Sequence, residues 1–526
     1  MRKKRVLYQS DGALAKTGFG RCSKALLTYL YNTGKYEIFH YIGGERENNR
    51  VTLEMTPWTC IGGLPSDPRE IQLLQQDPNV ARRASYGAHR LDSVIEKVKP
   101  DIYIAAQDIW GIDFCLEKPW WKKIKNNSAL WTTLDSRPIL PSAISAAKKA
   151  PNYWIWSDFA TKELHKLGHE HVKTVHGPVD TKYFKRLPDE IRVKLRESHG
   201  LSKNDFVIGF VFRNQLRKSI PNLLEGFSLF KKNFKVKSPK LLLHTHFGEG
   251  WDINKLRTEY DIPHKDILTT YICRNCHHYQ VSNFGGVERD CKICGKENSQ
   301  ITTNVSQGVT ENQLNDVYNL MDVYCHPFTS GGQEYPIQEA KLTELVTLVT
   351  NYSCGEEMCG REANSLPLDW FQYREHETQF IKASTDPKSI ARQLGKVYKM
   401  KPEKRRIMGM AARQWVVDNF SIESIGKKFE EFIDSKENLD WNDIILEEQP
   451  KNPHYVMPMH KMTDDEWILH IYENILNVKN ITMTDEGVIY WKKQMARGAS
   501  REQVEGKFRE VAMQDYVSRL KQNYEE

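Results

Sequence analysis

Four cysteines near the middle of the chain have the spacing of a metal site. Cys273 and Cys276 form one Cys-x-x-Cys pair, and after 14 further residues Cys291 and Cys294 form a second. Two such pairs converge into a tetrahedral thiolate site, so we predict a structural zinc ion in a ribbon over residues 271–300. A redox-active pair of dithiols is the alternative. The ribbon either only stabilises a long loop or also takes part in binding an acceptor polymer.

Residues 323–340 (VYCHPFTSGGQEYPIQEA) combine a short apolar strand, a turn cluster and a helix start. Pro336 suits the first helical turn, and the free backbone N–H groups of residues 335–337, to which Pro336 contributes none, attract anions. Glu339 lies one turn inside the helix, on the face that looks back towards the opening. Its carboxylate either accepts hydrogen bonds from two sugar hydroxyls or only complements the helix dipole.

Two cations follow a strongly apolar strand. Residues 206–212 (FVIGFVF) form a near-continuous apolar run of the kind that is buried in parallel sheets. Arg213 and Lys218 come just after this run, and two positive charges at a strand end suit a diphosphate.

The N-terminal part of the chain also places polar residues and glycines at strand ends. The first predicted strand leads into a loop with Gly18 and Gly20, which either let the backbone approach a ligand or are ordinary turn glycines. Asp108 and Asp135 each end a later predicted strand. Because open α/β sheets bind ligands beyond the carboxyl ends of their strands, both acids are candidate ligand-binding residues. A turn role for Asp108 and a helix-capping role for Asp135 are the alternatives.

These features resemble the retaining GT-B glycosyltransferases of the group 1 type, a large family that uses nucleotide sugars. The resemblance rests on the spacing from Arg213 to Lys218, on residues 311–322 (ENQLNDVYNLMD), on residues 336–340 and on the closing segment 385–420. It implies an α/β fold with two Rossmann-like domains facing a cleft. It also implies transfer of a hexosyl or pentosyl group from a UDP- or GDP-type sugar donor, with retention at the anomeric carbon.

The resemblance further implies roles for individual residues at the donor site. Arg213 and Lys218 would stabilise the diphosphate, Glu339 would hold the ribose, and the loop with Gly18 and Gly20 would face the donor phosphates. No metal is required at such a site, because the two cations neutralise the leaving group.

This chain departs from the family pattern in the middle of the donor site. The family usually has a second acid eight residues before Glu339, and here that position is Gly331. Either Glu334 takes over the sugar contact, or the donor sugar lacks the hydroxyl that the missing acid would bind. We therefore include Glu334 and its neighbour Tyr335 among the candidate donor-binding residues.

A second departure lies in the N-terminal half. Many family members carry a histidine near the end of the fourth strand, where this chain has Asp135. We therefore group Asp135 with Arg213 and Lys218 as the candidate catalytic residues.

The length and composition of the chain predict several globular domains. Its 526 residues are 40% hydrophobic and 27% charged, as in ordinary globular proteins. We predict an N-terminal Rossmann-like acceptor-side domain over residues 1–186, a nucleotide-sugar domain over 187–436, a linker over 437–460 and a helical module over 461–526. The last segment resembles a helical module appended to many bacterial and phage proteins, which suggests docking to a partner rather than chemistry.

The sequence also predicts the compartment. No run reaches the roughly 18 apolar residues of a membrane span, and the basic residues 1–5 pass into a strand without a signal-peptide core. The ten cysteines are not spaced as a disulfide framework, which fits a reducing compartment. We predict a cytoplasmic protein, in the host cytoplasm if it is phage-encoded.

The acceptor of the sugar is less constrained than the donor. A net charge of +7 permits an anionic acceptor without requiring one. The zinc ribbon and the appended module favour a polymer, and we lean towards a hydroxylated base in phage-type DNA. Two alternatives stay open: a glycosyltransferase of cell-surface glycan assembly, and a non-catalytic protein that binds sugar nucleotides or nucleic acid.

Overall fold

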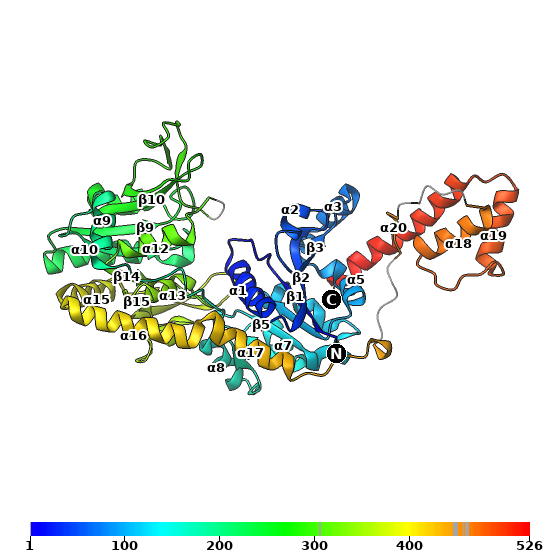
Figure 1. The fold of residues 1–526 in the computed structure, drawn as a ribbon, viewed down its shortest axis with the longest axis horizontal. Helices are drawn as coiled ribbons and strands as arrows, with labels where there is room; N and C mark the ends of the chain where they lie inside the picture. The colour runs from blue at the N-terminus through cyan, green and yellow to red at the C-terminus, as the bar shows by residue number, and fades with distance from the viewer. Residues whose placement is uncertain (1, 305–306, 445–450, 456, 458–461, 526) are drawn as a thin grey trace.

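The computed structural model describes residues 2–304, 307–444, 451–455, 457 and 462–525. Two α/β halves lie side by side, and a helical module extends from the N-terminal half (Figure 1). This is the architecture that alternating apolar runs and amphipathic stretches predict. Among the described residues, no helix is both long enough and apolar enough to cross a membrane.

The N-terminal half contains a seven-stranded parallel sheet in the order β3-β2-β1-β4-β5-β6-β7. Its strands are β1 (Lys4–Ser10), β2 (Tyr36–Arg46), β3 (Thr59–Leu64), β4 (Ile102–Ala106), β5 (Ser128–Thr132), β6 (Tyr153–Ile155) and β7 (Lys173–Thr174). Its α-helices are α1 (Gly18–Asn32), α2 (Arg50–Leu53), α3 (Pro68–Gln75), α4 (Pro78–Ala84), α5 (Leu91–Val98), α6 (Trp121–Ile124), α7 (Pro141–Lys149) and α8 (Asp158–Lys166). The strand order reverses between β1 and β4, the kind of switch point at which open α/β sheets bind ligands.

The C-terminal half contains a nine-stranded sheet in the order β12-β13-β10-β9-β8-β14-β15-β16, with β11 paired to β10. Its strands are β8 (Phe206–Val211), β9 (Pro239–His244), β10 (Ile267–Cys273), β11 (Tyr279–Asn283), β12 (Glu288–Arg289), β13 (Gln300–Thr302), β14 (Val323–His326), β15 (Val346–Thr350) and β16 (Leu366–Leu368). Its α-helices are α9 (Asp189–Ser198), α10 (Ile220–Phe234), α11 (Ile253–Glu259), α12 (Glu311–Asn319), α13 (Tyr335–Leu342), α14 (Gly355–Met358), α15 (Pro387–Lys399), α16 (Pro402–Phe420) and α17 (Ile422–Asp434). The second switch point lies between β8 and β14.

The central strands form the cores of both halves. Every residue of β4, β5, β8 and β15 is buried. Their apolar sequences require this, because parallel strands are covered by helices on both faces. The apolar runs therefore locate the sheet centres correctly, and with them the strand ends that carry the candidate residues.

The structure differs from the sequence prediction at several element boundaries. The sequence predicts the first helix over residues 21–32, but α1 begins at Gly18. The Thr17 side chain accepts a hydrogen bond from the Gly20 N–H and caps the helix there. The sequence predicts helices over the closing segment 385–420, but Thr385 is the last residue of a strand and α15 begins at Pro387. That strand, β18 (Ile381–Thr385), forms an antiparallel hairpin with β17 (Trp370–Arg374).

The last helix of the C-terminal half returns to the N-terminal half. The ring of Phe429 on α17 lies 4.6 Å from that of Trp131 on β5 and 5.1 Å from that of Trp154 on β6, centroid to centroid. Both contacts are edge-on, a favourable arrangement of aromatic rings. Helix α17 therefore packs against the N-terminal half and connects the two halves.

The C-terminal module consists of α18 (Asp464–Asn474), α19 (Glu486–Ala496) and α20 (Arg501–Glu525). The three helices share a small hydrophobic core of their own, which includes Trp467, Val488 and Phe508. The module contacts the N-terminal half where Tyr516 on α20 donates a hydrogen bond of 2.6 Å to Glu70 on α3. Residues 445–450, 456 and 458–460 of the predicted linker and residue 461 of the predicted module lie outside the described residues.

Candidate active site

A cavity of about 490 Å³ lies between the carboxyl ends of the two sheets. The N-terminal half contributes Asp108, which follows β4, and Asp135, which follows β5. The C-terminal half contributes Arg217 after β8, Glu334 after β14, and Lys382 in β18. These residues are far apart in the sequence, and they converge because parallel strands present their carboxyl ends at one edge.

Glu334 is the centre of the charged groups on the C-terminal side of the cavity. Its carboxylate pairs with Lys218 Nζ and, at 2.8 Å, with a guanidinium nitrogen of Arg217. His326 Nε2 lies 3.3 Å from the same carboxylate. Glu334 and Lys218 are buried, whereas the Arg217 side chain is 44% exposed and faces the cavity. One cation is thus fixed behind the carboxylate and a second is accessible to a ligand.

Burial and neighbouring charges set the protonation of this cluster. Burial would raise the pKa of Glu334, but Lys218 and Arg217 outweigh it and hold that pKa well below its usual range. Burial lowers the pKa of Lys218 to about 8, against the opposite effect of Glu334. It also lowers the pKa of His326 to about 4, so this imidazole is neutral near pH 7. The cluster then carries one net positive charge, which suits an anion.

Gly331 lies directly beside the Glu334 carboxylate. A Cβ atom at position 331 would be 2.7 Å from Glu334 Oε1, so the carboxylate fills the space that a side chain at 331 would enter. Glu334 is the N-cap residue of α13 and does not cap the helix with its side chain. Its carboxylate is thereby available at the position next to Gly331.

Asp135 lies on the N-terminal side of the cavity in a network that spans both halves. Its carboxylate accepts hydrogen bonds from Ser136 Oγ at 2.7 Å and from Ser330 Oγ at 2.9 Å. Lys382 Nζ donates to both hydroxyls, at 2.6 and 2.7 Å, and lies 3.6 Å from the carboxylate. The Asp135 side chain remains 39% exposed, so a ligand can reach it.

Asp108 is the second acid on this side. Its carboxylate accepts a hydrogen bond of 2.6 Å from Thr133 Oγ1. Burial is the main cause that raises the pKa of Asp108; the Thr133 hydrogen bond lowers it, and the nearby charge of Asp135 raises it further. Two acids in unequal environments thus line the same wall of the cavity.

Glu339 is fully buried, and both of its oxygens have partners. One pairs with the guanidinium of Arg21 on α1, and the other accepts a hydrogen bond of 2.7 Å from Tyr318. Arg21 therefore joins α1 of the N-terminal half to α13 of the C-terminal half. A ribose hydroxyl would have to replace Arg21 at this carboxylate.

The remaining predicted donor-site residues fall into two groups. Gly18 and Tyr335 line the cavity, and a Cβ atom at position 18 would lie 3.7 Å from the Tyr335 ring. Gly20 does not line it: a Cβ atom there would be 2.4 Å from the Ala15 carbonyl oxygen, so glycine is required by the loop itself. Arg213 also lies outside the lining, is 54% exposed and pairs with Glu249 at 3.4 Å.

Two cations of the cavity, Arg217 and Lys382, are absent from the sequence prediction. Arg217 directly precedes Lys218, and two adjacent cations after a buried strand are a signal that the sequence contained. Lys382 lies in the β17–β18 hairpin, whose sequence has no feature that connects it to the strand ends. Only the fold brings Lys382 to Asp135.

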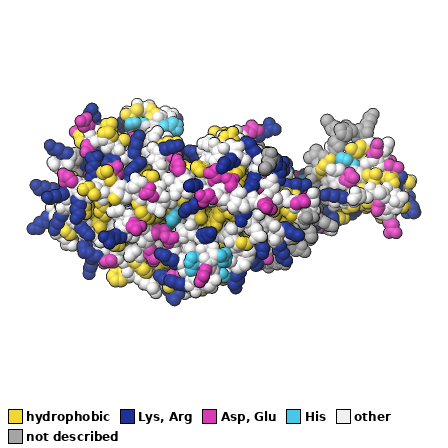
Figure 2. Space-filling model, turned by 60° about the horizontal axis from the view of Figure 1, so that its bottom comes forward, with side chains coloured by type: hydrophobic (Ala, Val, Ile, Leu, Met, Phe, Trp, Pro, Cys, Tyr) yellow, Lys and Arg dark blue, Asp and Glu magenta, His cyan; other side chains and the backbone are white. Residues whose placement is uncertain are grey.

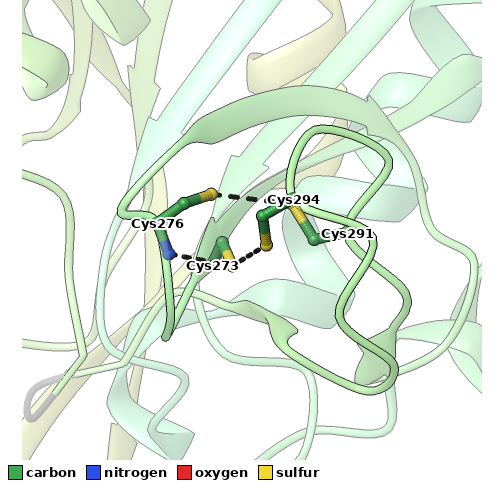
Figure 3. Close-up of side chains that lie close together, drawn as sticks. All are labelled: Cys273, Cys276, Cys291 and Cys294. Atoms are coloured by element: carbon green, nitrogen blue, oxygen red, sulfur yellow. Dashed lines mark hydrogen bonds between the residues drawn. The ribbon is translucent and has the colours of Figure 1, made fainter.

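The four predicted metal-ligating cysteines come together outside the cleft. Figure 3 shows their side chains turned towards one another. Cys273 ends β10, Cys276 lies in the turn that follows, and Cys291 and Cys294 lie in the loop between β12 and β13. Cys273 and Cys294 sulfurs are 3.7 Å apart, and those of Cys276 and Cys291 are 3.8 Å apart. A tetrahedron with Zn–S bonds of about 2.3 Å has edges of about 3.8 Å, so the sulfur positions fit a tetrathiolate metal site.

The ribbon is an extension of the main sheet rather than a separate loop. Strand β10 pairs with β9 in parallel and continues to Cys273, while β11 and β13 pair with it in antiparallel orientation. None of the described residues that line the cleft cavity belongs to residues 271–300.

Comparison with known proteins identifies the fold. No protein-family model matches the chain, and no curated protein matches it in sequence. Among solved structures, it is similar to a glycosyltransferase from Rickettsia africae, with a TM-score of 0.56 and 14% identity over 82% of this chain and 98% of that one. It is also similar to Anabaena HepE in complex with UDP, with a TM-score of 0.55 and 13% identity over 82% of this chain and 100% of that one. Its similarity to sucrose-phosphate synthase from Thermosynechococcus elongatus has a TM-score of 0.56 and 12% identity, over 82% of this chain and 98% of that one.

The chain therefore has the GT-B fold, in which two Rossmann-like halves face each other across a cleft. The predicted fold class is confirmed. A four-cysteine ribbon is inserted into the second half.

Proposed function

We propose that this protein is a retaining glycosyltransferase that moves a sugar from a nucleotide-diphosphate donor to a hydroxyl group of a polymer, with a hydroxylated base in phage-type DNA as the favoured acceptor. The observation that carries the proposal is the cleft cavity. There Arg217 and Glu334, with Lys218 behind them, stand opposite Asp108 and Asp135.

The donor diphosphate would lie beside the cations at the end of β8. Arg217 faces this position and Lys218 lies behind it. Arg213 lies in an exposed ion pair with Glu249, an interaction worth only about 0–1 kcal/mol. A phosphate can therefore draw Arg213 from Glu249. In the reaction the bond from the anomeric carbon to the diphosphate oxygen breaks, and the cations stabilise the charge left on that oxygen. HepE, which shares this fold, binds UDP and UDP-glucose, which supports a UDP-type donor.

Two buried acids near the start of α13, Glu334 and Glu339, would hold the sugars of the donor. Glu334 would accept hydrogen bonds from hydroxyls of the transferred sugar; the position of its carboxylate beside Gly331 at the cavity wall supports this role. Glu339 would hold the ribose after releasing Arg21. Tyr335, whose hydroxyl is buried without a hydrogen-bond partner among the described residues, and Gly18 would bound the same space.

The acceptor would enter from the N-terminal side. Asp135 and Asp108 would orient its hydroxyl group, whose oxygen forms the new bond to the anomeric carbon and whose proton passes to the leaving diphosphate or to water. Trp110 and Phe380 also line the cavity. Aromatic side chains of this kind stack on unpaired bases at about 1–3 kcal/mol per base, which supports a base as acceptor.

The charge distribution supports a polymer with phosphates. Figure 2 shows Lys and Arg side chains gathered at the left end of the molecule, where Figure 1 places α10, α15 and α16. Exposed cations at the ends of these helices, which we call the basic end, are Lys232, Lys235, Lys237, Lys396, Lys399, Lys401, Lys404 and Arg406. Such a surface attracts a nucleic-acid backbone and gives salt-dependent binding.

The four cysteines of the ribbon fit a structural zinc ion, and the donor site requires none. When bound, zinc would hold the two Cys-x-x-Cys turns together. Burial raises the pKa of the Cys273 thiol, but its hydrogen bond with Ser299 and those from the backbone N–H groups of Cys276 and Asn275 outweigh this effect and lower that pKa to about 6. Cys273 is thereby prepared to act as a thiolate ligand.

A donor screen tests the proposal. The purified protein is incubated with UDP- and GDP-sugars, and release of the nucleoside diphosphate is measured. We expect slow hydrolysis of one donor, its loss in Lys218→Ala, and its retention in the exposed control Lys232→Ala. If no sugar nucleotide is hydrolysed, and calorimetry finds no UDP or GDP binding, the donor site is not where we place it.

A further inference from the structure

Three potential metal ligands meet at the hinge between the two halves, outside the cleft cavity and the cysteine ribbon. Asp158 is the first residue of α8 in the N-terminal half, His176 lies in the segment that joins the halves, and Glu357 is on α14 in the C-terminal half. Each offers one ligand atom, and the three atoms lie within 4.8 Å of one another. None of them has a role in the donor or acceptor chemistry proposed above.

The hydrogen bonds at this site leave several polar atoms without partners. Glu357 Oε2 lies 3.0 Å from His176 Nε2 and accepts a weak hydrogen bond of 3.4 Å from the Asp158 backbone N–H. Glu357 Oε1 and His176 Nδ1 are both buried, and neither has a hydrogen-bond partner in the part of the chain that the structure describes. The Asp158 carboxylate has no hydrogen-bond or ion-pair partner among the described residues. The Glu357 side chain is only 9% exposed, so solvent does little to satisfy it.

A purely structural role explains only part of this arrangement. Ser157 does not cap α8 with its side chain, and Glu357 Oε2 takes over that function from across the interface. Capping uses one carboxylate oxygen. It does not explain why a second carboxylate, Asp158, lies beside a buried glutamate.

The surroundings lack a cation that would offset the two acids. Among the described residues, no Lys or Arg forms an ion pair with Asp158 or Glu357, and His176 supplies positive charge only when protonated. The imidazole of His176 is held by packing on Phe420, with ring centroids 4.2 Å apart. Two carboxylates and a fixed imidazole are a donor set that divalent transition metals prefer.

We propose that Asp158, His176 and Glu357 bind one divalent cation of the Mn²⁺ or Zn²⁺ class across the interdomain hinge. The ion neutralises the paired acids and gives the unpartnered atoms a ligand. Because the ligands come from both halves and from the connecting segment, the bound ion fixes the angle at which the halves meet. This site is separate from the cysteine site, whose four thiolates select zinc over the harder Mn²⁺.

Manganese binding tests the site without reference to any enzymatic activity. Protein that carries one equivalent of zinc, held by the four thiolates, and no donor is titrated with Mn²⁺, and free Mn²⁺ is followed by its EPR signal. We expect one Mn²⁺ per chain. Glu357→Gln should weaken binding by more than roughly 10-fold, because even a residue behind a ligand contributes that much to metal affinity. The matched control is Glu356→Gln, which changes the adjacent exposed acid on the same helix and should bind Mn²⁺ as the wild type does.

Two further variants keep the result interpretable. Asp158→Asn removes a carboxylate without a partner, so it should lose Mn²⁺ affinity while folding normally, even if Glu357→Gln is unstable. Asp135→Asn changes the acid of the cleft and should leave Mn²⁺ binding intact. Saturating Mn²⁺ should also raise Tm by roughly 2–4 °C in the wild type but not in Asp158→Asn. Absence of Mn²⁺ binding, or equal binding by wild type, Asp158→Asn and Glu357→Gln, would overturn the proposal.

Discussion

At the scale of single residues, the cleft is organised by a buried ion pair. Lys218 and Glu334 are both removed from water, which costs free energy that their mutual attraction and hydrogen bonds must offset. The pair therefore acts as a unit, and removal of one partner leaves a buried charge. Arg213 and Arg217 differ from Lys218 because their side chains are partly exposed.

This difference in burial leads to the first prediction. Arg213→Ala and Lys218→Ala should each lower turnover by roughly 10²–10³, the effect of removing one preorganised electrostatic donor. Arg213→Ala should leave thermal stability unchanged. Lys218→Ala should cost about 3–5 kcal/mol of unfolding free energy, because Glu334 loses its buried partner. Normal turnover in both variants would show that the diphosphate binds elsewhere.

A control separates stability from catalysis at Lys218. The double variant Lys218→Met with Glu334→Gln removes both buried charges, so it should regain stability relative to Lys218→Ala. It should not regain turnover, since the cation is still missing. Denaturant unfolding and donor hydrolysis measure the two effects independently.

The second prediction concerns pH. Burial lowers the pKa of Lys218 to about 8, so its positive charge is present below this pH and is lost as the pH rises through it. Since kcat/KM reports the free enzyme, kcat/KM for donor hydrolysis should fall above about pH 8. Lys218→Arg, whose guanidinium stays charged, should show no such fall even if its maximal rate is lower. A wild-type profile that stays flat to pH 10 would contradict the role of Lys218.

The third prediction addresses Glu339. Glu339→Gln should weaken UDP or GDP binding by roughly 10- to 100-fold, because a charge-assisted hydrogen bond worth about 1.5–3 kcal/mol is lost. Isothermal titration calorimetry measures this, with the exposed Glu362→Gln as control. Unchanged nucleotide affinity in Glu339→Gln would leave Glu339 with only its structural contacts to Arg21 and Tyr318.

At the scale of elements, the ribbon shows how an insertion is joined to a sheet. Strands β10 and β13 pair with each other directly beside the cysteines, so the metal site closes the end of a hydrogen-bonded ladder. We therefore expect the paired strands β10 and β13 to stay folded without the metal, whereas the turns between the cysteines should lose their ordered conformation.

The fourth prediction follows from this arrangement. Metal analysis of the reduced protein should find one zinc ion held by Cys273, Cys276, Cys291 and Cys294. Cys291→Ser should release it and speed hydrogen exchange within residues 271–300, while β8 and β9 stay protected. Cys60→Ser, outside the cluster, should keep the metal. A reduced wild-type protein without metal would refute the zinc site.

At the scale of the whole molecule, charge is distributed unevenly over a modest net value of +7. The basic end lies at the ends of α10, α15 and α16, while the cleft holds balanced pairs of acids and cations. Binding of a polyanion and hydrolysis of the donor should therefore respond differently to salt.

The fifth prediction uses this contrast. Affinity for DNA oligonucleotides should fall steeply between about 50 and 200 mM salt, because each phosphate contact releases counterions. Replacing Lys396, Lys399 and Lys404 by Gln should reduce the slope of log K against log salt by roughly 2–3. Donor hydrolysis should hardly change. An unpaired target base should react faster than a paired one, because a paired base must first leave the stack.

The matched control removes the same number of positive charges from the N-terminal half. Replacing Lys122, Lys123 and Lys148 by Gln alters three exposed cations outside the basic end and should leave the salt slope unchanged. Transfer to a free or lipid-linked saccharide, with no salt-sensitive binding to any oligonucleotide, would instead favour cell-surface glycan assembly.

The sequence by itself determined the sheet centres, the cysteine site and several strand-end residues. Apolar runs such as residues 206–212 have to be buried on both faces, so they located β8 and, with it, the candidate cations beyond its end. The two Cys-x-x-Cys pairs fixed a local cluster, because each pair is brought together by a short turn.

Tertiary structure decided which of these residues act together. Glu339 is paired with Arg21, 318 residues away in the chain, and Lys382 reaches Asp135 from a hairpin that the apolar pattern did not show. The hinge cluster of Asp158, His176 and Glu357 likewise joins three separate segments. Periodicity and motif spacing report only on neighbours along the chain. Contacts between the halves depend on how two sheets meet at their carboxyl edges, which no local pattern encodes.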